Sequence, residues 1–268
     1  MGTADRAMAS LGRMEALTRQ DTPIHRRHPL AHLLVALGYL VTLASFRRYE
    51  LAGLLPFLFY PLAVAALGEL PLGDLMRRGL PVLPLVLFLG AFNPIFDQNV
   101  LLFAGYRLSA GWLSLVSMTL RGILSVLAAL LLAATAGMAG LGRALGLLRV
   151  PQVIVTQLLF TYRYLFVLGG EGGRMWLAYS LRASGQRGVA FRQWGSFAGQ
   201  WLLRSLHRAE RIHAAMLCRG FDGAMPGGPA VPFAWADGLY AAGWIAFFVA
   251  ARLVNLPLWL GSLLIGGT

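Results

Sequence analysis

The sequence predicts an all-α polytopic membrane protein with about five transmembrane helices and a cytoplasmic coupling domain of amphipathic helices. Apolar residues make up 57% of the 268 residues and charged residues only 13%, which is about half the charged share of a soluble domain. The net charge is nonetheless +12, and all 23 basic residues are arginine. Long apolar runs separated by arginine clusters are typical of a chain in a bilayer, with its arginines enriched on the cytoplasmic side.

Five apolar segments approach the length of about 20 residues that a membrane-spanning helix needs. They are 30–46, 51–68, 80–96, 112–136 and 233–251. The second and third contain prolines, which membrane helices tolerate because neighbouring groups satisfy the freed carbonyls. The stretch 256–265 is too short to span, so we expect it to extend the chain end or to lie at the interface.

The arginine distribution predicts the orientation. The first 29 residues are polar, carry five arginines and show no secretory cleavage pattern, so we expect a cytoplasmic N-terminus in a bacterial inner membrane. Arg77 and Arg78 then lie inside and segment 97–110 outside, whereas Arg47 and Arg48 contradict the positive-inside bias. The predicted regions are listed in chain order: a tail over 1–29, four spans over 30–136, a coupling domain over 137–230, and a last span and tail over 231–268.

The block 137–230 differs from the rest because it holds eleven arginines and three acidic residues, a net charge of +8. Apolar residues recur there at helical spacing, opposite a face of arginines. Pro151 is expected to begin a helix that ends near Leu168, before glycines that flank Glu171. A second helix is expected over 174–184, and a third over 197–219.

Both later helices are expected to finish on an arginine close to a glycine. Arg182 precedes Gly185 by three positions, and Arg219 directly precedes Gly220, which suits the position after a helix C-terminus. Cations at helix C-termini are favoured by about 0.3–1 kcal/mol. These residues alone leave two interpretations open: ordinary caps, or contacts for a partner.

The run 200–223, QWLLRSLHRAERIHAAMLCRGFDG, resembles the signature of the transmembrane (T) component of energy-coupling factor (ECF) transporters, in the cobalt/nickel or CbiQ-like subgroup. Its most specific element is Ala215-Met-x-x-Arg-Gly-Phe221. Weaker matches are YRYLF at 162–166, NPIF at 93–96 and HRRHP at 25–29. The resemblance covers about residues 22–252.

The resemblance implies the membrane-embedded coupling subunit of an ATP-driven cobalt or nickel importer, without catalytic residues, a metal site or a cofactor of its own. Its implied partners are two ATP-binding subunits and a substrate-binding membrane subunit. In the family, two Ala-Arg-Gly-like motifs at helix ends dock into the ATPases. The second maps onto Arg219 and Gly220, with Cys218 in place of alanine. The first maps onto Arg182 and Ala183, or alternatively onto Arg187. The implied interface also includes Leu206, Ile212, Met216 and Phe221.

Several polar residues have alternative interpretations. His25, His28 and His32 have a spacing at which a transition metal is conceivable, but Pro29 interrupts their helical face. Arg121 in the fourth span and Asp237 near the start of the last are functional candidates, because intramembrane charges often are. Arg121 can equally pair with a backbone carbonyl inside the bundle, or extend its side chain to the membrane interface.

Other functions have less support. Without lysine the chain has no P-loop, and a single cysteine excludes an internal disulfide. An intramembrane enzyme would need a motif such as HExxH or GxSxG, and neither is present. A stand-alone transporter and a subunit for another substrate, such as a vitamin, remain alternatives. The sequence does not distinguish cobalt from nickel.

Overall fold

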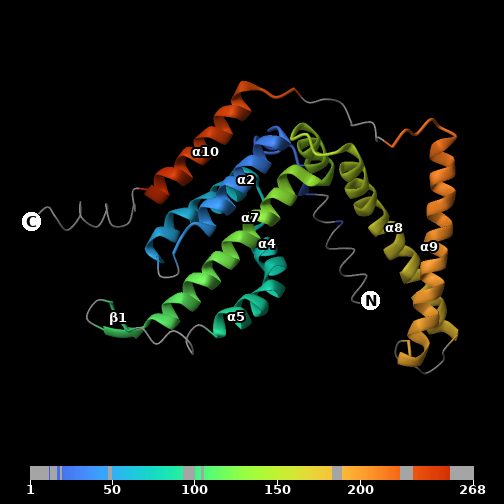
Figure 1. Cartoon of the computed structure of the whole chain (residues 1–268), viewed down its shortest axis with the longest axis horizontal. Helices are drawn as coiled ribbons and strands as arrows, with labels where there is room; N and C mark the ends of the chain where they lie inside the picture. The colour runs from blue at the N-terminus through green and yellow to red at the C-terminus, as the bar shows by residue number, and fades with distance from the viewer. Residues whose placement is uncertain are drawn as a thin grey trace, which may run out of the picture. The chain divides into compact units, whose positions relative to one another are not determined.

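The structure is a computed structural model that describes residues 12, 17–18, 20–47, 50–92, 100–103, 106–182, 189–223 and 232–253 (Figure 1). The chain divides into two compact units. The described parts of 16–141 and 231–268 form one, which we call the bundle unit. The described part of 142–230 belongs to the other, which we call the helix-pair unit.

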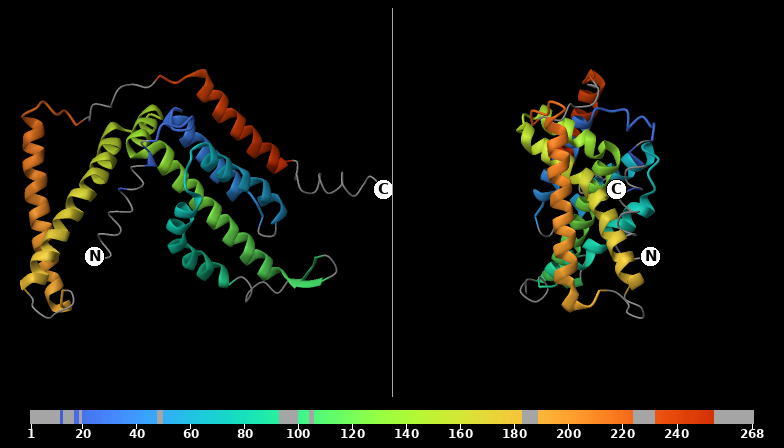
Figure 2. Two further views of the ribbon diagram at one scale, coloured as in Figure 1. Left: turned by 180° about the vertical axis from the view of Figure 1, so that it is seen from behind. Right: turned by 90° about the vertical axis from the view of Figure 1, so that its right-hand side faces the viewer.

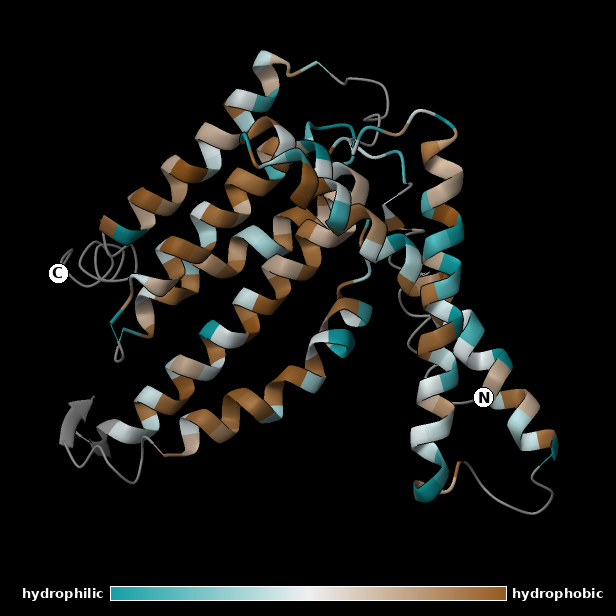
Figure 3. Ribbon diagram, turned by 45° about the vertical axis from the view of Figure 1, so that its right-hand side comes forward, coloured by the Kyte–Doolittle hydropathy of each residue, from teal (hydrophilic) through white to brown (hydrophobic). Residues whose placement is uncertain are grey.

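The bundle unit consists mainly of apolar helices, as the hydropathy colouring in Figure 3 shows. In chain order its elements are α2 (Pro29–Ala44), the 3-10 helix η1 (Ala52–Leu58), α3 (Phe59–Leu67), α4 (Leu72–Gly79), the 3-10 helix η2 (Leu80–Val82), α5 (Leu83–Ala91), strands β1 (Val100–Phe103) and β2 (Tyr106–Ser109), most of α7 (Ala110–Leu147), and α10 (Trp235–Leu253). Pro29 can be the first residue of α2 without loss of a hydrogen bond, because the first N–H of a helix has no intrahelical partner.

Helix α10 packs along α2 (Figure 1), and aromatic side chains fill the core beside them. Tyr39 is completely buried, and its ring centroid lies 4.8 Å from that of Tyr60 and 5.2 Å from that of Phe248. The Tyr39 hydroxyl donates to the backbone oxygen of Phe57 at 3.0 Å. This hydrogen bond gives the buried Tyr39 hydroxyl a partner, which the surrounding aromatic rings could not provide.

Three helices of the described residues are long and apolar enough to cross a membrane: Gly111–Leu147, Gln152–Arg182 and Trp235–Leu253. Two shorter apolar helices, Pro29–Ala44 and Ala52–Leu67, correspond to the first two predicted spans. The apolar helices confirm the predicted all-helical, polytopic class, although Gln152–Arg182 lies in block 137–230, where no span was predicted.

Some elements differ from the prediction. The third predicted span is matched only by η2 and α5, which end at Ala91; positions 93–96 and 256–265 lie outside the described residues. Strands β1 and β2 form an antiparallel hairpin with Val100 opposite Ser109, where only a loop was expected. Gly137 interrupts α7 with a φ of 62°, which falls in the region that favours glycine.

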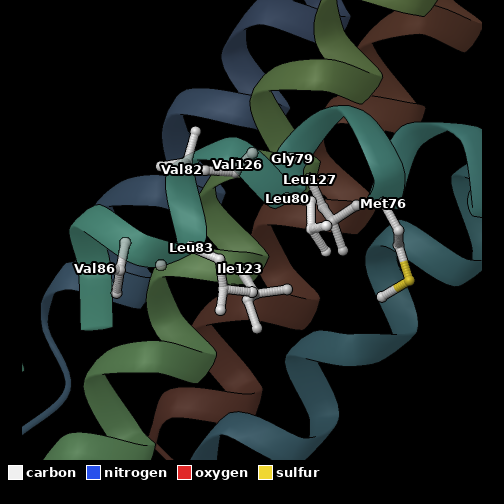
Figure 4. A pocket seen from close by; sticks show the side chains of 10 residues that line it. Met76, Gly79, Leu80, Val82, Leu83, Val86, Ile123, Val126 and Leu127 are labelled. Atoms are coloured by element: carbon white, nitrogen blue, oxygen red, sulfur yellow. The ribbon is translucent and has the colours of Figure 1, made fainter. Parts of the chain in front are cut away.

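A small apolar cavity of about 130 Å³ lies where α4, η2 and α5 face α7 (Figure 4). Two glycines allow this approach. A Cβ at Gly122 would lie 2.9 Å from Val86, and one at Gly79 would lie 3.1 Å from Val126. Small residues commonly let membrane helices approach closely, so these two positions hold the bent α4–α5 segment against α7.

The helix-pair unit contains α8 (Gln152–Arg182), the 3-10 helix η3 (Phe191–Gln193) and α9 (Trp194–Leu217), which lie side by side (Figure 2). The prediction that glycines around Glu171 end one helix and start another was wrong, because α8 runs through them for 31 residues. An interior glycine costs a helix only about 1 kcal/mol relative to alanine. Gly172 also has a packing role, because a Cβ there would lie 3.1 Å from Trp201.

Candidate functional site

Helix α9 ends in a complete Schellman motif. The Phe221 N–H donates to the Met216 carbonyl at 3.0 Å, and the Gly220 N–H donates to the Leu217 carbonyl at 3.0 Å. Gly220 has a φ of 78°, which is the left-handed conformation that this motif requires after the helix. The structure therefore confirms Gly220 as the residue after the helix end, and the motif leaves Arg219 exposed in the turn.

A groove of about 620 Å³ lies between α8 and α9 next to this turn. Three of the four residues expected at a partner interface, Ile212, Met216 and Phe221, line it. The Phe221 ring lies 6.1 Å from that of Phe160 on α8, so the turn is anchored to the neighbouring helix. Leu206, the fourth residue, is 50% exposed and is not among the lining residues.

The other candidate arginine, Arg182, is the last residue of α8 and is exposed. Arg182 therefore lies at the C-terminus of α8, and Arg219 lies just beyond the C-terminus of α9. Ala183 and the alternative Arg187 lie outside the described residues.

The contacts along α8 and α9 show that the two helices are antiparallel. At one end the Tyr179 hydroxyl donates to the side-chain oxygen of Gln193, and at the other Phe221 lies against Phe160. Because the helices run in opposite directions, their C-terminal ends lie at opposite ends of the pair. The structure therefore separates Arg182 from Arg219 rather than bringing them together.

Glu171 is the centre of the polar contacts between the two helices. Its carboxylate lies 2.6 Å from Arg174 on its own helix, and 3.4 Å from both Arg204 and Arg208 on α9. Beside it, the indole N–H of Trp201 donates to the Leu168 backbone oxygen at 3.2 Å. Sequence reasoning noted Glu171 only as a marker within the glycines and missed its three partners.

The three N-terminal histidines have structural partners. The Nδ1 of His28 accepts from the Leu30 N–H at 3.1 Å and caps α2. His32 donates from Nε2 to the Ile24 backbone oxygen at 3.0 Å, and Nδ1 of His25 lies 2.6 Å from the Thr22 hydroxyl. Among the residues that the structure describes, no cluster of three His, Cys, Asp or Glu could hold a metal ion.

Asp237 joins the start of α10 to the start of α2. One carboxylate oxygen accepts from the His28 N–H at 3.2 Å, and the other accepts from the Ala234 N–H at 3.1 Å. Arg27 lies 3.8 Å from the same carboxylate, which is 7% exposed. The sequence marked Asp237 as a functional candidate because it is a charge in a predicted span. The structure shows that it connects the starts of two helices.

Arg121 on α7 holds the chain just beyond the C-terminal end of α2. Its guanidinium donates to the backbone oxygen of Phe46 at 2.7 Å and also to that of Arg47. Arg252, at the end of α10, donates to the Ser45 backbone oxygen at 3.1 Å and pairs with Glu50 at 3.3 Å. Pairing with a carbonyl was one of the alternatives for Arg121, and it is the one that the structure shows.

The family model described as "CbiQ: Cobalt transport protein" matches residues 20–228. The match includes α2, both helices of the helix-pair unit and the turn that contains Arg219. No curated protein matches the chain.

Proposed function

The chain belongs to the CbiQ cobalt transport protein family, the T component of ECF importers, and from this premise we propose that it transmits ATPase movement to a substrate-binding membrane subunit. The substrate carried by the complex is a divalent metal ion, cobalt or nickel. The proposed route runs through Arg182 and Arg219, each of which contacts one of two ATP-binding subunits.

The observation that carries this proposal is the antiparallel helix pair with an exposed arginine at or just beyond the C-terminal end of each helix. Two grooves on two ATPase copies need two anchors that are well separated. Arginine suits such an anchor because its planar guanidinium makes several hydrogen bonds in a fixed geometry, and two to one carboxylate. The closing of the ATPase dimer would then displace both ends of the pair.

The chain itself is proposed to be non-catalytic, with the energy supplied by its partners. It has no lysine and therefore no P-loop. The net charge of +8 in block 137–230 favours acidic docking surfaces on the ATPases and a cytoplasmic location for the helix pair. Under that orientation the N-terminus is cytoplasmic, in a bacterial inner membrane.

Purification of the assembled complex tests the proposal. Expressed with an ATP-binding subunit and a substrate-binding membrane subunit from the same genome, the chain should copurify in detergent with two ATPase copies, without added ATP. Mass determination of the intact complex measures this stoichiometry. Uptake of Co²⁺ or Ni²⁺ into liposomes by the chain alone would instead support a stand-alone transporter.

A comparison of two variants tests which arginine forms the first anchor. We expect Arg182→Ala to weaken ATPase binding by at least about 30-fold, because the loss of a buried, paired arginine at an interface costs about 2–5 kcal/mol. Arg187→Ala should bind the ATPases like the unmodified chain. A binding titration with the purified ATPase measures both, and the reverse result would assign the first motif to Arg187.

A further inference from the structure

We propose that Glu171 is the pivot of the helix pair, a positioning residue that holds α8 and α9 together where they cross and limits their crossing angle to a narrow range. The crossing angle sets the separation between Arg182 and Arg219. The use of this separation in transport rests on the proposed function, whereas the pivot itself is a property of the helix pair.

Charge is concentrated at one point between the two helices. Glu171 is one of only three acidic residues in a block with eleven arginines, and three guanidinium groups surround it. Its side chain is 16% exposed, whereas the side chains of Arg174 and Arg204 are 67% and 60% exposed. A carboxylate that is mostly covered is less screened by salt than a surface ion pair, so this cluster holds the helices together more firmly than a fully exposed pair would.

The helices also have a tight steric contact at this position. Trp201 on α9 lies against the backbone of α8 at Gly172, where a Cβ would come within 3.1 Å of the indole. The indole N–H donates to the Leu168 carbonyl one turn earlier. This contact and the ion cluster thus occupy the same turn of α8, which makes this turn the natural axis of rotation.

The cluster lies well before the C-terminal end of each helix. Arg182 lies 11 residues beyond Glu171 on α8, whereas Arg219 lies 11 residues beyond Arg208 and 15 beyond Arg204 on α9. At 1.5 Å per residue, the arm is about 16 Å long on α8 and about 16–22 Å long on α9. A change of about 10° in the crossing angle would therefore move each arginine by about 3–4 Å relative to the pivot.

The arrangement of the partners allows such a change without loss of the ion cluster. Arg204 and Arg208 lie on successive turns of α9 and contact different oxygens of Glu171 at equal distances of 3.4 Å. As the helices rotate, the carboxylate can approach one guanidinium while it leaves the other.

Distance measurements between spin labels test the pivot in the full chain. Cys218 is the single cysteine of the chain, lies at the end of α9 and is exposed. Leu181→Cys supplies a second label site at the end of α8, where the native leucine is 75% exposed. Double electron–electron resonance in lipid nanodiscs should give a single narrow distance distribution for the labelled chain.

With Glu171→Gln, we expect this distribution to broaden at least twofold, and Glu171→Asp should restore most of the narrow population. Glu210→Gln, an acidic residue that is exposed on α9, is the matched control and should leave the distribution unchanged. Arg208→Gln removes one partner and should broaden the distribution, which also covers a failure of the Glu171 variant to fold. An unchanged distribution in the folded Glu171 or Arg208 variant would overturn the proposal.

The assembled complex, without labels, distinguishes the pivot from the proposed function. Glu171→Gln should keep both ATPases bound but lower metal uptake per ATP hydrolysed by about tenfold, because the ends no longer move together. If the unmodified chain binds no ATPase, the proposed function fails, although the spin-label result still decides whether Glu171 limits the crossing angle. Normal uptake per ATP in the variant would overturn the role of the pivot in coupling.

Discussion

Arg219→Ala should lower metal uptake by the assembled importer at least about 30-fold while the chain inserts and folds normally. The Schellman turn at Gly220 is made by backbone groups, so the substitution leaves the turn intact. What it removes is an exposed guanidinium at the end of α9, which the proposed function places in an ATPase groove. The loss of such a paired charge costs about 2–5 kcal/mol of affinity or coupling, and uptake of radioactive Co²⁺ into proteoliposomes measures it.

Two variants serve as controls for this experiment. Arg211→Ala removes another exposed arginine from the same helix and should leave uptake near that of the unmodified complex. Arg219→Lys keeps the charge but not the planar group, so we expect intermediate uptake if fixed hydrogen-bond geometry matters. Full uptake by Arg219→Ala would contradict the assignment of this residue as an anchor.

Asp237→Ala should lower the free energy of unfolding by about 2–4 kcal/mol, because it removes the acceptor for two backbone N–H groups at the starts of α2 and α10, that of buried His28 and that of Ala234. It also leaves Arg27 without the carboxylate at 3.8 Å. The contacts between α2 and α10 should loosen first, since Asp237 joins the starts of both helices. Thermal unfolding of the purified protein in detergent, followed by the exposure of native tryptophans, measures the change.

Asp237→Asn separates the two contributions of this side chain. The amide oxygen retains an acceptor for one of the N–H groups, so this variant should lose less stability than Asp237→Ala. Asp74→Asn changes an acidic residue in the first turn of α4 and should be within about 0.5 kcal/mol of the unmodified protein. A stability of Asp237→Ala equal to that of the control would show that the carboxylate does not hold the two helices.

Patterns local in the sequence predicted most of the fold. The apolar runs gave α2, α7 and α10, because burial in a bilayer requires a long apolar helix wherever the chain crosses. Arg219 and Gly220 marked the end of α9, because a glycine that adopts a positive φ after a helix is a local requirement. The prediction that a helix ends at the glycines around Glu171 was wrong for a physical reason. Glycine lowers helix stability only modestly, and the packing of Trp201 against Gly172 outweighs this cost.

Contacts between distant residues explain what sequence reasoning missed at the site. Glu171 meets Arg204 and Arg208 across separations of 33 and 37 residues, and Asp237 meets His28 across 209. The sequence around Glu171 or Asp237 does not specify the partner of the carboxylate, because that partner depends on how the helices pack. The available signal was that Glu171 is one of only three acidic residues among eleven arginines, because a carboxylate there has several possible partners.

The antiparallel packing of α8 and α9 has a consequence for symmetry. A single chain without an internal repeat is proposed to face two copies of an ATPase, which a dimer would relate by a two-fold axis. Two antiparallel helices, each with an exposed arginine at or just beyond its C-terminal end, are themselves related by an approximate local dyad. Through the helix pair, a membrane protein without internal symmetry thus presents a pseudo-symmetric surface to a symmetric ATPase dimer.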